Sequence, residues 1–314
     1  MKIAVVEPLG ISESTFASLK SEFEASGHNF TFHTDRNEDP QVLAERMRDA
    51  DIVVVSNIKL SADTLSQCRN LKMLSIAFTG LDHVDLDYCQ RNGIVVKNAA
   101  GYSTTAVSEL TVALMLDLLR QVTPFNSVTR QSGSRGTYAG SELRGKTVGI
   151  VGTGAIGCAT ARLLKAFGCN LIAYSRTQRT EATALGIKYM PLDTMLPLCD
   201  ILTLHLPLNQ ETHHLIDSHR LSLLKPTALL VNTARGNVVD IPALAEALKN
   251  RKLAGAAVDV YEQEPPLPPS HPLFNAPNCI MLPHIGYATT EAFAARADIV
   301  MNNVRQFIDN SKQQ

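Results

Sequence analysis

Arg235, Glu264 and His284 are the residues of this chain that best suit acid–base chemistry on a carbonyl compound, and each follows a short apolar run. Arg235 suits a carboxylate or keto oxygen, because its guanidinium is planar and always charged. Histidine is the residue type that suits proton donation near neutral pH, so His284 is the candidate donor, while Glu264 can orient the imidazole and favour its protonated form. Each residue alone also has an ordinary structural explanation, so the hypothesis requires that all three meet.

A second chemical signal is the glycine pattern G-x-G-x-x-G formed by Gly152, Gly154 and Gly157. The apolar run TVGIV precedes it and the helical pattern AIGCATARLLKAFG begins inside it. In this context Gly152 permits a tight turn, Gly154 lets backbone approach a pyrophosphate, and Gly157 lets helix and strand pack closely. Ala155 and Ile156 then form the helix start, whose N–H groups favour phosphate. A plain glycine turn is the alternative, but the pattern predicts a dinucleotide site.

The strand after the glycine pattern indicates which dinucleotide is bound. An NAD site has an acidic residue there for the ribose hydroxyls, whereas this chain has Ser175, Arg176 and Thr177. These three side chains suit a 2′-phosphate, because Arg176 forms charge-assisted hydrogen bonds with phosphate. The sequence therefore favours NADP(H), with NAD(H) and a solvated arginine as the alternative.

The elements that would position these residues alternate between short apolar strands and amphipathic helices. We expect strands at 3–7, 29–33, 51–55, 72–76 and 93–97, then at 146–152, 171–175, 201–205, 228–232, 256–260 and 279–283. This alternation predicts the α/β class, with two doubly wound parallel sheets in two domains. Since ligands bind at the carboxyl ends of such strands, the chemical motifs should converge there.

The connecting segments yield further expectations. Residues 104–120 predict a long helix that is apolar around much of its circumference and buried in the core or in a subunit interface. Residues 121–145 are polar and rich in glycine and serine, so we expect irregular structure there. The proline-rich stretch 264–272 predicts a loop. Residues 289–309 predict a helix that folds back across the first domain.

Composition excludes several classes of function. The 314 residues carry a formal net charge of −1, which does not favour binding to nucleic acid or to an anionic membrane. No apolar run is long enough for a membrane span, and the N-terminus does not resemble a signal peptide. The six cysteines form no CxxC and have no metal-ligand spacing with histidine, so we expect reduced thiols, no metal and a cytoplasmic location.

Five segments together resemble the D-isomer-specific 2-hydroxyacid dehydrogenase family across nearly the whole chain. They are GKTVGIVGTGAIG (145–157), HLPLNQETHHLI (205–216), LLVNTARGNVVD (229–240), GAAVDVYEQEPP (255–266) and LPHIG (282–286). The resemblance implies two Rossmann-like or flavodoxin-like domains with the active site in the cleft between them, usually as a homodimer. Residues 1–100 with 287–314 would form the substrate-binding domain, and 101–286 the dinucleotide-binding domain.

The resemblance also implies roles for individual residues. Arg235, Glu264 and His284 would be catalytic, and the substrate would be a small 2-oxo or 2-hydroxy acid. Thr79 and Gly80 would bind the substrate carboxylate through backbone N–H groups, together with Arg235 and His284. The remaining cofactor contacts would come from His205, Pro207, Thr212, Thr233, Ala234, Asp259 and Gly286.

Positions at which the sequence departs from the family pattern indicate which members of the family it resembles most. Ser175 and Arg176 make the chain look most like NADPH-preferring glyoxylate and hydroxypyruvate reductases. Glu264 stands where formate dehydrogenase has glutamine, which disfavours that relative. Tyr287 stands where glycine is common, and the chain has no tryptophan, so the acid itself is not specified. Two alternatives remain at this point, a corepressor-like dinucleotide sensor and a non-redox NAD(P)-binding module.

Overall fold

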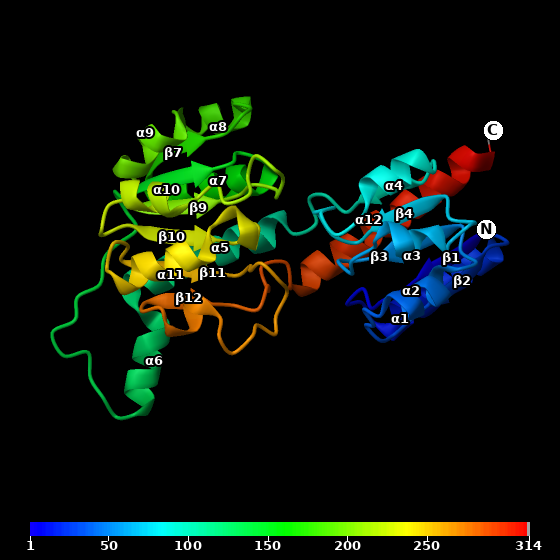
Figure 1. Ribbon diagram of the computed structural model, residues 1–314, viewed down its shortest axis with the longest axis horizontal. Helices are drawn as coiled ribbons and strands as arrows, with labels where there is room; N and C mark the ends of the chain where they lie inside the picture. The colour runs from blue at the N-terminus through cyan, green and yellow to red at the C-terminus, as the bar shows by residue number, and fades with distance from the viewer. Residues whose placement is uncertain (313–314) are drawn as a thin grey trace. The chain divides into compact units, whose positions relative to one another are not determined.

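The computed structural model describes residues 1–312 and divides into two compact units. Unit 1 comprises Met1–Ser103 and the segment that begins at Ala288, and unit 2 comprises Thr104–Tyr287. Each unit is built on one parallel β-sheet with flanking helices (Figure 1). The predicted α/β class with two parallel sheets is confirmed.

Unit 1 contains a five-stranded parallel sheet in the order β2-β1-β3-β4-β5. Every residue of β3 and β4 is buried, which explains why these central strands are continuous apolar runs. Its strands are β1 (Lys2–Val5), β2 (Asn29–Phe32), β3 (Ile52–Val55), β4 (Met73–Ile76) and β5 (Val95–Asn98). Its helices are α1 (Glu13–Ala25), α2 (Pro40–Met47), α3 (Ala62–Ser66), α4 (Leu86–Arg91) and α12 (Thr290–Lys312).

The last helix, α12, packs on the sheet of unit 1 as the sequence predicts. It lies against β4 and β5, and the Ser75 hydroxyl donates a 3.0 Å hydrogen bond to the carbonyl of Val300. Val300, Met301 and Val304 of this helix are buried. The chain therefore returns to its first sheet after completing the second.

Unit 2 contains a seven-stranded parallel sheet in the order β12-β11-β10-β9-β6-β7-β8. The order reverses between β6 and β9, which is the switch point at which open α/β sheets bind ligands. Its strands are β6 (Thr147–Val151), β7 (Asn170–Tyr174), β8 (Lys188–Tyr189), β9 (Ile201–Leu204), β10 (Leu229–Asn232), β11 (Gly255–Val258) and β12 (Cys279–Met281). The two-residue β8 was not predicted, because KY has too few residues to show a period.

Helices cover both faces of this second sheet. Alternate strand residues point to opposite faces, so Leu230 and Val231 belong to different apolar clusters. One cluster includes α5 (Thr104–Arg120) and α7 (Ala155–Ala166), and the other includes α9 (Leu192–Met195), α10 (Ser218–Leu223) and α11 (Ile241–Lys249). The predicted long buried helix is α5, and it packs against α7, β10 and β11 of its own chain. Short elements between these are α8 (Thr180–Ala184), η1 (Leu196–Leu198), η2 (Gly236–Val238) and η3 (Pro272–Asn275).

The expectation of irregular structure throughout 121–145 was wrong, since α6 (Val122–Arg130) lies within it. The two carboxylate oxygens of Asp117 accept hydrogen bonds from the backbone N–H and the hydroxyl of Thr123, which stabilise the first turn. Gln121 precedes the helix in a left-handed conformation. No residue of α6 is buried, although Val122, Phe125 and Val128 recur every third residue along it. The glycine and serine residues that follow the helix dominate the composition of 121–145, which is why the segment was expected to be irregular. Figure 1 shows α6 as a separate helix between α5 and the long connection to β6.

No helix in residues 1–312 is long and apolar enough to cross a membrane.

Candidate active site

The predicted glycine turn connects β6 to α7 and leaves no room for side chains at two of its three glycines. Gly152 has φ +96°, and a Cβ there would lie 2.5 Å from the carbonyl oxygen of His205. A Cβ on Gly157 would lie 2.1 Å from the carbonyl oxygen of Gly152. At Gly154 a Cβ would meet nothing within 4 Å, so the space above this residue is open to a ligand. The turn therefore combines tight internal packing with an open backbone surface.

That surface borders a cavity of about 250 Å³ at the switch point of the unit 2 sheet. Eight residues nominated from the sequence line it, namely Gly152, Gly154, Ser175, Arg176, Thr177, His205, Pro207 and Thr212. Ala155 and Ile156 form the first turn of α7 beside it, where N–H groups are available to an anion. With Arg176 and Arg179 on the rim, these residues fit the phosphates of a dinucleotide.

Tyr189 fixes the glycine turn to the rim of the cavity. Its hydroxyl donates a 2.8 Å hydrogen bond to Thr153 Oγ1 and accepts one of 3.1 Å from the backbone N–H of Arg179. This tyrosine comes from β8, the short strand that the sequence did not indicate. The contact fixes the backbone of Arg179 relative to the turn.

His205 follows β9 at the floor of the same cavity. Its Nε2 lies 3.1 Å from Thr203 Oγ1. Burial lowers the pKa of His205 to about 4, so the ring is neutral at physiological pH. It therefore adds shape and a neutral hydrogen-bonding group to the cavity, and no charge.

The segment after His205 brings an acidic residue into the cavity. Asn209 Oδ1 accepts hydrogen bonds from the backbone N–H of Glu211 at 2.9 Å and of Thr212 at 3.0 Å. Thr212 Oγ1 donates a 2.7 Å bond to the carbonyl of Pro207, which closes the segment into a fixed loop. Glu211 forms an ion pair with Arg176. Glu211 was not predicted from the sequence, because the acid of an NAD site is expected directly after β7 and not after β9.

The three acid–base motifs leave neighbouring strands at one edge of the unit 2 sheet. β10, β11 and β12 are adjacent and parallel, so their carboxyl ends lie side by side. The backbone N–H of Asp259 donates a 3.0 Å hydrogen bond to the carbonyl of Asn232. The backbone N–H of Leu282 donates a 2.9 Å hydrogen bond to the carbonyl of Val258. The expected convergence of strand ends within unit 2 is thus present.

Glu264 and His284 are in direct contact. His284 Nδ1 lies 2.8 Å from one carboxylate oxygen of Glu264 and 3.0 Å from the other. The histidine side chain is 12% exposed and the glutamate side chain 53% exposed. The Tyr287 ring meets the imidazole edge to face, with centroids 5.2 Å apart. Because Nδ1 faces the carboxylate of Glu264, Nε2 is the ring nitrogen left to exchange a proton with a ligand.

Asp259 fixes the backbone that carries His284. Its two carboxylate oxygens accept hydrogen bonds from the backbone N–H groups of Ile285 at 2.8 Å and Gly286 at 2.7 Å. His284 itself has φ +59°, a left-handed conformation that side chains other than glycine adopt seldom. Burial raises the pKa of Asp259 although these two N–H groups lower it. The strained histidine is therefore maintained by a buried carboxylate on the neighbouring strand.

Arg235 is presented by a turn that Asn232 organises. Asn232 is buried, its Oδ1 accepts from Ala234 N at 3.1 Å, and its Nδ2 donates to the carbonyl of Arg235 at 2.9 Å. Thr233 Oγ1 lies 2.9 Å from Thr111 Oγ1 on α5. Thr233, Ala234 and Arg235 were predicted site residues, and Asn232, which was not predicted, positions their turn.

Thr79 and Gly80, the nominated carboxylate-binding residues, follow β4 in unit 1. Asn98 Nδ2 donates a 2.7 Å hydrogen bond to the carbonyl of Thr79, which fixes this loop to the end of β5. Thr79 is exposed to solvent. The loop therefore leaves its sheet at the carboxyl edge, as the strand pattern predicts.

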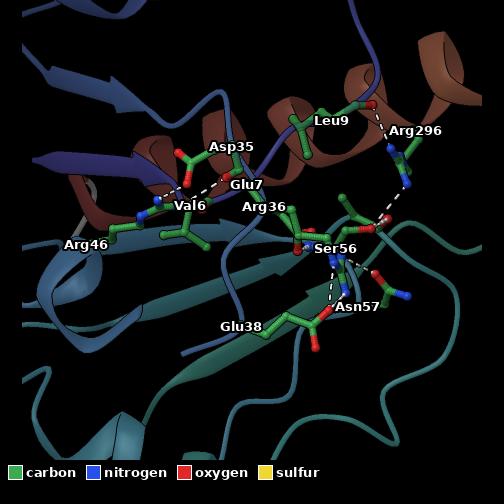
Figure 2. A network of polar contacts seen from close by, with 11 residues as sticks. Val6, Glu7, Leu9, Asp35, Arg36, Glu38, Arg46, Ser56, Asn57 and Arg296 are labelled. Atoms are coloured by element: carbon green, nitrogen blue, oxygen red, sulfur yellow. Dashed lines mark hydrogen bonds and ion pairs between the residues drawn. The ribbon is translucent and has the colours of Figure 1, made fainter. Parts of the chain in front are cut away.

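The carboxyl edge of unit 1 also holds a buried polar network that the sequence did not indicate (Figure 2). Glu7, directly after β1, accepts 2.6 Å hydrogen bonds from Ser56 N and from Arg36 Nη1. Arg296 on α12 donates to the carbonyl of Leu9 at 2.6 Å and to Ser56 Oγ at 3.2 Å. Burial raises the pKa of Glu7, although Arg36 opposes that shift. The network ties the ends of β1 and β3 to α12.

Four of the six cysteines are buried, and Cys169 and Cys279 are half-buried. All six cysteines are free, and burial raises the pKa of Cys199 and of Cys279 to about 12. Such thiols are protonated at neutral pH and are poor nucleophiles. Residues 1–312 contain no group of three or more histidine, cysteine or acidic side chains arranged to hold a metal ion.

Comparison with known proteins agrees with the geometry. Residues 112–286 match the family model described as "D-isomer specific 2-hydroxyacid dehydrogenase, NAD binding domain". A glyoxylate reductase of Thermofilum pendens is 40% identical over 270 residues, covering 83% of this chain and 79% of the relative.

Solved structures resemble this chain along nearly its whole length, and two of them contain a nicotinamide dinucleotide. One is an acyclic imino acid reductase (Bsp5) in complex with NADPH and D-Arg, with a TM-score of 0.88, 25% identity and coverage of 99% of this chain and 98% of the other. The second is D-lactate dehydrogenase from Aquifex aeolicus complexed with NAD and lactic acid, with a TM-score of 0.87, 28% identity and coverage of 99% and 96%. The chain therefore belongs to the D-isomer specific 2-hydroxyacid dehydrogenase family and is a nicotinamide-dinucleotide-dependent dehydrogenase.

Proposed function

We propose that the protein reduces a small 2-oxo acid to a D-2-hydroxy acid, with Arg235, Glu264 and His284 as its catalytic residues. The observation that carries this proposal is the two-oxygen contact of Glu264 with His284 Nδ1, at 2.8 and 3.0 Å. A carboxylate in that position stabilises the imidazolium and fixes the ring orientation. A sensing role on the same fold needs no such pair, so it is not favoured.

In this proposal the chain's own residues bind the acid and supply the proton. Arg235 holds the substrate carboxylate and polarises the keto oxygen, because its charged fork matches both groups. The backbone N–H groups of Thr79 and Gly80 also bind the carboxylate. His284 gives the proton on Nε2 to the keto oxygen, and Glu264 stabilises the ring while it carries charge. Carbon 2 also needs a hydride, which a nicotinamide dinucleotide held by these residues would supply, and hydride and proton together would convert the keto group to an alcohol.

We propose that NADP(H) is the preferred cofactor. Ser175, Arg176 and Thr177 line the cavity where a 2′-phosphate would lie, and Arg179 adds a second guanidinium to the same rim. Gly152, Gly154, Ala155, Ile156 and Gly157 would hold the pyrophosphate through backbone N–H groups. Thr233, Ala234, Asp259 and Gly286 would hold the nicotinamide end, with His205, Pro207 and Thr212 nearer the adenosine.

We propose glyoxylate and hydroxypyruvate as the first substrates to test, following the relative from Thermofilum pendens named glyoxylate reductase. Purified protein is mixed with NADPH and a panel of glyoxylate, hydroxypyruvate, pyruvate and phenylpyruvate, and absorbance at the reduced nicotinamide band is followed. The proposal predicts turnover with at least one acid and faster turnover with NADPH than with NADH. Tight dinucleotide binding without oxidation by any acid would contradict it. An equal or faster rate with NADH would contradict only the cofactor preference.

We further propose a homodimer that works in the cytoplasm, without a nucleic acid or membrane partner. The helix α6 has no buried residue, and Val122 is 58% exposed, so this helix is a surface that a second copy could cover. The six free cysteines suit a reducing compartment. Sedimentation at twice the chain mass would support the dimer, and sedimentation at the chain mass would reject it.

A further inference from the structure

The rim of the dinucleotide cavity holds a cation and an anion that face each other. Arg176 comes from the segment after β7 and Glu211 from the segment after β9, and the two form an ion pair. Both line the cavity, and among the described residues that line it Glu211 is the only carboxylate. The two side chains come from strands on either side of β6, which ends at the glycine turn.

Glu211 is held in place by its backbone and not by a rigid side-chain environment. Asn209 Oδ1 accepts its N–H at 2.9 Å, inside the loop closed by Thr212 and Pro207. The side chains of Arg176 and Glu211 are 69% and 67% exposed, so water screens their mutual attraction. Exposed pairs of this kind contribute little to stability, and a bound ligand can separate them at small cost.

We propose that Glu211 sets the balance between the two nicotinamide dinucleotides, by replacing the acid that is missing after β7. The inference deepens the proposed function and rests on its dinucleotide site. When the ribose carries free 2′ and 3′ hydroxyls, both can donate to the carboxylate of Glu211, as they would to an acid in the usual position. Arg176 then remains paired with the same carboxylate.

A 2′-phosphate changes the interaction with both rim residues. The esterified 2′ oxygen no longer donates a hydrogen bond, and the phosphate's charge repels a carboxylate at the same rim. Arg176 turns from Glu211 to the phosphate, with which it forms stronger charge-assisted bonds. Glu211 therefore favours NAD(H) and opposes NADP(H), while Arg176 favours NADP(H). As a result the chain accepts both cofactors, with a moderate preference for NADP(H).

The chain offers a matched control for this pair. Arg162 on α7 and Glu181 on α8 also form an ion pair, with side chains that are 58% and 59% exposed. Neither residue is among those that line the cavity. Glu181→Gln therefore removes a comparable exposed carboxylate from a comparable arginine without altering the proposed site.

The test measures binding to the full-length protein by fluorescence titration and by calorimetry. The ligands are NADPH and NADH, together with the adenosine-end probes adenosine 2′,5′-bisphosphate and adenosine 5′-monophosphate. We expect Glu211→Gln to tighten NADPH and the bisphosphate about threefold to tenfold and to weaken NADH by a similar factor, from the usual strength of exposed charge pairs. Arg176→Ala should weaken NADPH about tenfold or more and change NADH by less than about twofold.

The outcomes separate this inference from the proposed function. If neither dinucleotide binds the unmodified protein, the dinucleotide site itself is wrong. If both dinucleotides bind, the ratio of the Kd for NADPH to the Kd for NADH is compared between Glu211→Gln and Glu181→Gln. Equal ratios in the two variants would show that Glu211 has no part in cofactor selection. Equal weakening of both dinucleotides by Glu211→Gln would also overturn the inference, because it would indicate a purely structural loop residue.

Discussion

At the scale of single residues, the candidate site depends on a few polar groups whose partners come from other strands. His284 has φ +59°, and Asp259 on the adjacent strand end holds the two N–H groups that follow it. Such local strain persists only where surrounding contacts determine the backbone. Asp259 is thus a positioning residue for the imidazole, besides its expected place near the nicotinamide.

Asp259→Asn is therefore expected to lower kcat about tenfold to a hundredfold, because small displacements of a catalytic group have large effects on rate. An amide has only one oxygen to offer, so one of the two N–H groups loses its acceptor. We expect the Kd for dinucleotide to rise by a smaller factor than kcat falls, because Asp259 is only one of the residues proposed to hold the nicotinamide end. Steady-state kinetics and fluorescence titration measure the two effects separately.

Asp240→Asn is the matched control, since Asp240 also accepts a backbone N–H, that of Ala243 at the start of α11. It should lower thermal stability slightly and leave kcat unchanged. A loss of cofactor affinity as large as the loss of kcat in Asp259→Asn would mean that Asp259 acts mainly on the cofactor.

The pH dependence of the free energy of unfolding should reveal the lowered pKa of His205. Its pKa in the folded protein is about 4, below the ordinary 6.5, so between these values the unfolded chain binds a proton that the folded chain does not. The free energy of unfolding should therefore fall as pH drops from 6.5 to 4, with about 3 kcal/mol from this residue.

Urea denaturation at a series of pH values tests this prediction. His205→Gln should reduce the decline, whereas His219→Gln, at a residue on α10, should not. An identical decline in His205→Gln and in the unmodified protein would show that His205 is not the group responsible.

At the scale of elements, the sequence was most informative where chain segments are regular and buried. Apart from β8, the ends of the strands were predicted to within two residues, because parallel strands covered on both faces are continuous apolar runs, as β3 is. Helix α5 was predicted at its observed bounds, Thr104–Arg120. Helix α6 was missed because the glycine and serine residues that follow it made the whole segment 121–145 resemble irregular structure, and β8 was missed because it has only two residues.

The same reasoning explains which site residues the sequence missed. Glu211 and Tyr189 act on the cavity through contacts with Arg176 and Thr153, which are far away in the chain. Motif spacing predicts groups on consecutive strand ends, but it does not predict which loop returns to face another. Asn232 lies within a motif, yet its role became apparent only from the turn that its side chain organises.

Alanine substitutions at two glycines of the glycine turn should have different effects on stability, because a Cβ would be crowded at Gly157 and not at Gly154. Gly157→Ala places a Cβ 2.1 Å from the Gly152 carbonyl oxygen, so the turn must shift and thermal stability should fall by several degrees. Gly154→Ala meets nothing within 4 Å, so its melting temperature should change by less than about two degrees.

Dinucleotide binding should separate these two variants further. Gly154→Ala is expected to weaken binding about tenfold or more although the protein stays folded, because the methyl group occupies the space meant for pyrophosphate. Calorimetric titration with NADPH measures the loss. Unchanged affinity in Gly154→Ala would mean that the phosphates lie elsewhere.

At the scale of the whole molecule, two parallel sheets each present polar residues at their carboxyl edges. Unit 2 carries the dinucleotide cavity and the Glu264–His284 pair, and unit 1 carries the Thr79 loop and the network around Glu7. The formal net charge of −1 means that an anionic acid and an anionic dinucleotide must be attracted by local groups. Arg176 and Arg235 are the local cations on which the proposed function depends.

The role of His284 as proton donor is tested by the effect of His284→Ala on turnover and on dinucleotide binding, measured in one preparation with His219→Ala as control. We expect kcat to fall about 10²- to 10⁴-fold while the Kd for NADPH changes less than about threefold. A collapse of NADPH affinity, or a kcat equal to that of His219→Ala, would contradict the assignment of His284 as the proton donor.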